Sequence, residues 1–132
     1  HAAGVKFHIP HGRLNSILMP HIIQYNANVA TTGTSAGNLN KETAERYQQI
    51  ARLLGLSAST PILGVRQLVD AVRKLQKKLD HPTSLRSYGV GVDDFNAHKR
   101  EIAEAALLDK CTITNPRVPT VEELLKVLEQ AF

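Results

Sequence analysis

The segment from Thr60 to Leu79 reads TPILGVRQLVDAVRKLQKKL, and it decides the fold class. Thr60 is a good helix-capping residue, and Pro61 fits the first helical position. Apolar residues then recur every three or four positions, which is the spacing of one helix face. These residues are Ile62, Val65, Leu68, Val69, Val72, Leu75 and Leu79. The pattern predicts an amphipathic helix of about five turns, which His81-Pro82 is expected to end.

Helical spacing also appears on the N-terminal side of this segment. After Pro10-His11-Gly12 the apolar positions predict a helix that Pro20 kinks. Residues 27–40 are rich in Thr, Gly, Ser and Asn and are expected to form a loop. The next helix is predicted to begin at Asn38 or Asn40 and to end at Gly55. Its expected inner face is Ala44, Tyr47, Ile50, Ala51 and Leu54.

On the C-terminal side the sequence predicts three further helices. A short one is expected at residues 84–88, and a longer one begins at Asp93 or Asp94 and runs to about Asp109. Thr120 and Glu123 form a capping box that opens the last helix. The only weak candidate for a strand is the segment 5–9. The sequence therefore predicts an all-α, bundle-like fold in which residues 1–132 form a single helical domain.

Composition excludes several classes of protein. The chain has 132 residues, 42% hydrophobic and 21% charged, which is ordinary for a globular domain. No apolar run approaches the ~20 residues that span a bilayer, and one cysteine fits a reducing compartment. We therefore expect a cytoplasmic protein with no membrane partner. The net charge is only +4 and tryptophan is absent, which speaks against a nucleic-acid partner.

Two short motifs contain the residues that are suited to chemistry. The first is His1 followed by Pro10-His11-Gly12 and Asn15, and the second begins at Cys111. Imidazole is a good ligand for first-row metals, although a helix-terminal His11 without a ligand is the alternative. Cys111 is either a reactive thiol or a buried small hydrophobe. A zinc site made by His1, His8 and His11 is not expected, because no Cys or Asp lies at a matching spacing.

The order Pro-His-Gly-x-x-Asn and then Cys-Thr-x-x-Asn-Pro-Arg, here Cys111 to Arg117, resembles the C-terminal helical domain of the iron-dependent (group III) alcohol dehydrogenases. It looks most like the alcohol dehydrogenase part of the bifunctional aldehyde-alcohol dehydrogenases. The resemblance implies that His11 is a metal ligand and that His1 lies beside the nicotinamide, with a role in proton transfer or cofactor positioning. It also implies that Phe7 and Cys111 line the substrate pocket, with a core role as the alternative for Phe7. Asn15 would orient the ligand helix, with simple packing as the alternative.

The resemblance also implies that much of the enzyme lies outside this chain. The family holds Fe²⁺ (or zinc) with one Asp and three His, of which only His11 has a counterpart here. No glycine-rich phosphate loop is present, so the half that binds NAD(P) is absent. The resemblance thus implies a domain that is incomplete at its N-terminus and has the missing N-terminal part as its partner. A small alcohol or aldehyde would be the substrate of the parent enzyme.

Two expectations follow for the isolated chain. It should bind no cofactor and show no dehydrogenase activity, because most of the site is missing. It should also form homo-oligomers, because the apolar face from Leu14 to Tyr25 would be uncovered. The alternative function is a non-catalytic helical module that acts in interaction or oligomerisation.

Overall fold

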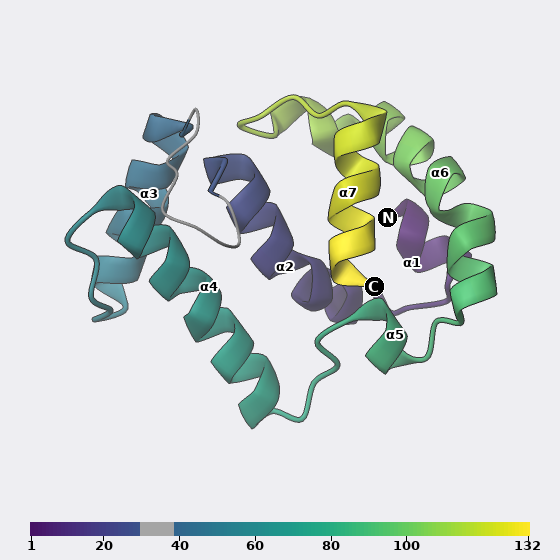
Figure 1. Ribbon diagram of the computed structural model, residues 1–132, viewed down its shortest axis with the longest axis horizontal. Coiled ribbons are helices and arrows are strands. Elements are labelled where there is room, and N and C mark those ends of the chain that lie inside the picture. Colours follow the sequence, from purple (N-terminus) through teal and green to yellow (C-terminus); the bar gives the residue numbers. More distant parts are fainter. Residues whose placement is uncertain (30–38) are drawn as a thin grey trace. The chain divides into compact units, whose positions relative to one another are not determined.

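The computed structural model describes residues 1–29 and 39–132, and over these residues it is helical and contains no strand (Figure 1). The all-α prediction is therefore confirmed. In chain order the elements are α1 (Ala2–Lys6), α2 (His11–Ala27), α3 (Lys41–Leu53), α4 (Pro61–Lys78), α5 (Leu85–Tyr88), α6 (Val92–Leu108), the 3₁₀ helix η1 (Lys110–Thr114) and α7 (Val121–Ala131). No helix in the described ranges is long and apolar enough to cross a bilayer.

The chain divides into two compact units. The first unit comprises residues 1–19 and 76–132, and the second comprises residues 20–75. Each unit has an apolar core of its own. The single domain over residues 1–132 stays a prediction.

The first unit is built around α6, which packs against α1, α7 and η1 (Figure 1). Its core contains the fully buried side chains of Leu14, Ile17 and Leu85. The ring of Phe95 on α6 stacks on that of Phe132, with 4.2 Å between centroids, and lies 6.4 Å from that of Phe7. Phe95 thereby joins the residue after α1 to the end of α7.

The second unit packs α4 closely against α3. A Cβ atom on Gly64 would lie 2.6 Å from Cα of Gln48, so only glycine allows this approach. The amide of Gln48 donates a hydrogen bond of 2.8 Å to the carbonyl oxygen of Ala58. The helix contact is therefore made of backbone against backbone, with one buried polar bond beside it.

We expect Gly64→Ala to destabilise the chain by about 1–3 kcal/mol, because the added methyl group meets backbone that cannot rotate away. Urea unfolding followed by circular dichroism measures this change. Gly12→Ala is the matched control, since it also lies in a helix but has no atom within 4 Å of the added Cβ. The control should stabilise the chain by up to about 1 kcal/mol through helix propensity. Equal effects of both substitutions would contradict the packing argument.

Most helix ends lie where the sequence predicts them. Thr120 and Glu123 form the predicted capping box at the start of α7. Asn40 caps α3, whereas the other candidate, Asn38, lies outside the described residues. The N-cap of α6 is Gly91, so the prediction of a cap at residue 93 or 94 is wrong. Both aspartates lie in the first turn instead, where the helix dipole favours a negative charge.

Three predictions about local structure and burial are wrong. Segment 5–9 is not a strand, because its first two residues belong to α1 and the next two form a turn. Four residues expected to face inward are exposed: Ile50, Leu54, Leu75 and Leu79. Leu14 and Ile17, expected to be uncovered, are fully buried in the core of the first unit. Apolar spacing predicts which face of a helix is apolar, but it does not predict how much of that face the neighbouring helices cover.

The buried Gln76 is an example of a polar group that the spacing rule misses. It follows the exposed Leu75, and its amide donates a hydrogen bond of 2.6 Å to the carbonyl oxygen of Ser16. This bond replaces the hydration of the amide nitrogen, whereas the amide oxygen is buried without a hydrogen-bond partner among the described residues. Gln76 therefore ties the end of α4 to α2 within the first unit.

His21 is buried in the second unit, and burial, with a smaller contribution from the positive charge of Arg73, lowers its pKa below the ordinary 6.5. In the unfolded chain this imidazole takes up a proton as the pH falls through 6.5, whereas the folded chain takes it up only at a lower pH, because its pKa is lowered. The unfolded state then binds more protons, so stability falls as the pH falls below that value.

We expect a lower melting temperature at about pH 5.5 than at about pH 7.5, because the unfolded state takes up the His21 proton at a higher pH than the folded state does. His21→Gln should reduce the difference between the two melting temperatures, which circular dichroism measures. An unchanged difference in this variant would show that other groups cause the pH dependence.

Candidate functional site

The two histidines of the first motif meet because the chain reverses between α1 and α2. His1 is the N-cap of α1, and His11 is the first residue of α2. Between them His8 has a positive φ of 52°, and the amide of Ile9 donates to the carbonyl oxygen of Gly4 at 3.0 Å. The imidazole rings of His1 and His11 stack with 5.1 Å between centroids and 15° between planes. A turn and a short helix thus place two imidazoles face to face.

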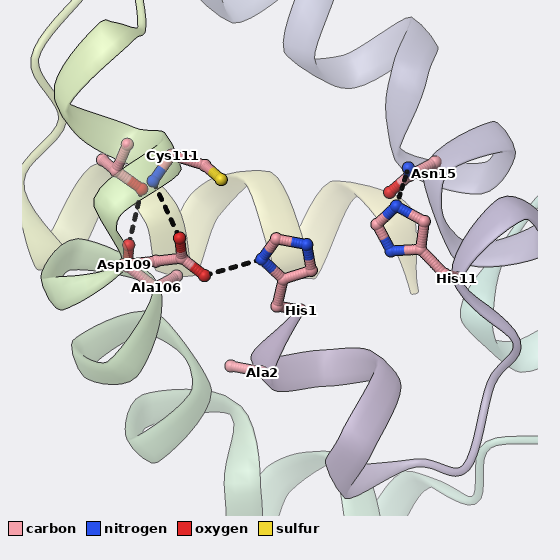
Figure 2. Close-up of a pocket in the computed structure, with 8 residues that line it drawn as sticks. His1, Ala2, His11, Asn15, Ala106, Asp109 and Cys111 are labelled. Atoms are coloured by element: carbon pink, nitrogen blue, oxygen red, sulfur yellow. Dashed lines mark hydrogen bonds and ion pairs between the residues drawn. The ribbon is translucent and has the colours of Figure 1, made fainter.

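Asp109 completes this arrangement from the far end of the sequence. Nδ1 of His1 lies 2.7 Å from Oδ2 of Asp109, so the ring of His1 stands between a carboxylate and a second ring (Figure 2). The other carboxylate oxygen, Oδ1, accepts a hydrogen bond of 2.8 Å from the backbone amide of Cys111. This bond is the main reason that the pKa of Asp109 is lowered. An ionised Asp109 can orient the imidazole and fix which ring nitrogen bears the proton.

A cavity of about 400 Å³ adjoins these side chains. It is lined by His1, Ala2, His11, Asn15, Ala106, Asp109, Cys111 and Thr112. The hydroxyl of Thr112 donates a hydrogen bond of 2.6 Å to the carbonyl oxygen of Ala106, which anchors η1 to the end of α6. The cavity walls therefore come from the starts of α1 and α2 and from the connection between α6 and η1.

The structure gathers most of the residues that the sequence singled out. His1, His11, Asn15 and Cys111 all line the cavity. Cys111 is exposed, which excludes its reading as a buried hydrophobe in the described residues. Phe7 is not among the lining residues and is 8% exposed in the core, so its place in the substrate pocket stays a prediction.

Sequence reasoning missed Asp109 as a site residue and treated it as a helix end. The contact with His1 joins residues 108 positions apart, and no spacing rule connects them. Its position two residues before Cys111 is the only signal in the sequence. The side chain of Asp109 also accepts the first amide bond of η1, so one residue ends α6, caps η1 and orients His1.

His11 is chemically suited to hold a metal ion. Its ring is exposed at the cavity, and Nε2 lies 2.9 Å from the amide nitrogen of Asn15, one helical turn along α2. An amide side chain offers both a donor and an acceptor, so Asn15 can hold either tautomer of the ring. Metal-binding histidines are commonly oriented by such a partner on their other ring nitrogen. The donor type and its support therefore fit iron or zinc, with His11 as one ligand.

Comparisons with known proteins identify the family of the chain. A model of the C-terminal part of the Fe-containing alcohol dehydrogenase family matches residues 1–132. The aldehyde-alcohol dehydrogenase of Streptococcus pneumoniae serotype 2 is 38% identical, and the match covers 100% of this chain and 15% of that protein. An NADPH-dependent butanol dehydrogenase of Clostridium saccharobutylicum is 35% identical over 100% of this chain and 31% of its own length.

A solved structure gives the same result for the fold. The crystal structure of a 1,3-propanediol oxidoreductase superposes with a TM-score of 0.80 at 26% identity. That match covers 100% of this chain and 31% of the other. The chain thus spans less than a third of the length of these relatives. Sequence and fold agree over all 132 residues, and the chain belongs to the Fe-containing alcohol dehydrogenase family, whose C-terminal part it matches.

Proposed function

We propose that this chain is the C-terminal part of an iron-dependent, NAD(P)-linked alcohol dehydrogenase that interconverts primary alcohols and aldehydes. One observation carries the proposal: His1, Asp109 and His11 meet at one cavity in a chain that matches this family from end to end. The names of the relatives, among them an aldehyde-alcohol dehydrogenase and a butanol dehydrogenase, support the substrate class.

In the proposed enzyme His11 would be one ligand of the metal, and Asn15 would keep its ring in place. The remaining ligands would come from residues that precede His1. When bound, iron (or zinc) would polarise the alcohol oxygen as a Lewis acid, and the nicotinamide would accept the hydride. Loss of the Asn15 amide should weaken metal binding by about 10–100-fold, as is usual for a group that orients a metal ligand.

The proposed role of His1 is to move a proton between the cavity and solvent. Its side chain is 53% exposed, while Asp109 holds Nδ1 at 2.7 Å. The carboxylate stabilises the imidazole when both nitrogens carry protons, so His1 can accept a proton on one side and release it on the other. Cys111 would face the substrate from the wall formed by η1.

The missing N-terminal part of the enzyme is the proposed partner of the first unit. Three apolar side chains near η1 are strongly exposed: Leu108 (85%), Ile113 (80%) and Val118 (81%). Exposed apolar side chains mark an interface where they gather into one patch, and these three lie within eleven consecutive residues of the chain. The same residues would also pair copies of the isolated chain, and light scattering of Ile113→Ser should then show less association than the parent chain.

We expect the isolated 132-residue chain to have no alcohol dehydrogenase activity, because one imidazole cannot hold the metal as the complete site does. The assay uses purified chain, Fe²⁺ added without oxygen, NAD or NADP, and short primary alcohols, with NAD(P)H absorbance as the readout. Turnover above that of a sample without protein would contradict this prediction. The upstream reading frame gives an independent test, since the proposal expects an Asp-x-x-x-His motif there.

A further inference from the structure

We propose that His1, Asp109 and Cys111 form a binding site for a zinc-like divalent cation, separate from the metal position proposed for His11. Each of the three residues offers one ligand atom, and these atoms all lie within 4.8 Å of one another. Figure 2 shows the sulfur of Cys111 on the same side of Asp109 as the ring of His1. No other such group occurs in the described part of the chain.

The ligand types select the ion. A thiolate favours soft or borderline cations over Mg²⁺ and Ca²⁺, and imidazole with carboxylate completes a set that suits Zn²⁺. Three protein ligands leave the fourth tetrahedral position open, and here that position would be filled by water or a small anion from the adjoining cavity of about 400 Å³. The proposed site therefore has the ligand number of an open zinc site.

Only small movements are needed to admit the ion. Around tetrahedral zinc the ligand atoms lie on the order of 3.3–3.7 Å apart, whereas Nδ1 of His1 and Oδ2 of Asp109 are 2.7 Å apart. The cation replaces the proton between them and widens this contact. Half of the His1 side chain is exposed and Cys111 is exposed, so both can turn without disturbing the core.

The backbone already holds Asp109 in a suitable position. Its Oδ1 accepts from the amide of Cys111, which leaves Oδ2 directed at His1. Asp109 caps η1, Cys111 lies two positions further on in the same element, and Thr112 ties that element to α6. The backbone positions of two of the three ligands are thus fixed relative to each other before the ion arrives, and of these two only the side chain of Cys111 has to turn.

Occupancy of this site would have a consequence for the His1 proton path, and this consequence rests on the proposed function. A ring nitrogen that binds zinc cannot carry a proton at the same time. Zinc at His1, Asp109 and Cys111 would therefore stop proton transfer through His1 without displacing the metal at His11. The binding test below does not depend on turnover, so it can fail or succeed independently of the proposed enzyme activity.

The test is metal binding by the reduced, metal-free chain. We expect one equivalent of Zn²⁺ in equilibrium dialysis, and Co²⁺ should give a near-ultraviolet thiolate-to-cobalt absorption band. Cys111 is the only cysteine of the sequence, so that band reports on this site alone. Cys111→Ser should abolish the band. Asp109→Asn should weaken zinc binding by more than about tenfold, because the loss of a group that only orients a metal ligand already lowers metal affinity by that factor.

Two controls separate this site from other binding. Asp94→Asn removes the carboxylate of another exposed His–Asp pair, His98 and Asp94 at 2.9 Å, and should leave zinc binding unchanged. His11→Asn should keep the cobalt band. Zinc binding that survives Cys111→Ser at full strength, or that is lost in His11→Asn, would overturn the proposal, as would the absence of a cobalt band in a chain with unchanged circular dichroism.

Discussion

His11→Ala should lower the activity of the full-length enzyme that carries this segment by at least about 100-fold, which is the upper end of the effect of losing a group that merely orients a ligand. The physical reason is that the proposed metal loses one of its four ligands, and with it the position from which it polarises the alcohol. His11 is exposed at the cavity and is held by Asn15, so its removal should cost little stability. The loss should therefore appear in metal content and in kcat/KM rather than in the melting temperature.

The matched control is His98→Ala. His98 is also on a helix and also has a polar partner, but it lies outside the cavity. We expect unchanged activity and unchanged iron content in this variant. Equal iron content in His11→Ala and the parent enzyme, measured by plasma emission spectroscopy, would contradict the ligand role of His11.

The second large effect is expected for the core of the first unit. Phe95→Ala should destabilise the chain by about 3–5 kcal/mol, because Phe95 is 3% exposed and its ring contacts those of Phe132 and Phe7. The free energy of unfolding of a native protein is about 5–15 kcal/mol in total, so the loss is a large fraction of the stability of this chain. Urea unfolding followed by circular dichroism measures it.

Phe95→Leu keeps most of the buried volume and should cost less than Phe95→Ala. It also keeps the prediction testable if the alanine variant does not fold. Because Phe95 anchors the end of α1 through Phe7, the leucine variant should retain the His1–Asp109 contact, which proton NMR of the imidazole can detect. If the parent chain and both variants had the same free energy of unfolding, this ring stack would not hold the unit together.

The sequence predicted the helices well, because each depends on spacing and caps within a few residues. Thr120 and Glu123, for example, form the capping box that marks the start of α7. The exposure of Leu75 and Leu79 and the burial of Gln76 were not predictable in this way. Those outcomes depend on where a neighbouring helix ends, which is information from tertiary structure.

The candidate site was predictable only in part. Four of the lining residues lie in two short motifs: His1, His11, Asn15 and Cys111. The resemblance of these motifs to the iron-dependent alcohol dehydrogenases predicted their importance from the sequence alone. Asp109 was not marked, because its role depends on a contact with His1 from the other end of the chain. A carboxylate at a helix end has many ordinary functions, and only the fold shows that this one faces an imidazole.

The most direct test of the proposed function is a crystal structure of the full-length enzyme, with diffraction data collected on both sides of the iron absorption edge. We predict one anomalous peak bonded to a ring nitrogen of His11, with its other protein ligands from residues that precede His1. Iron bound at another position, with no bond to His11, would contradict the proposed function.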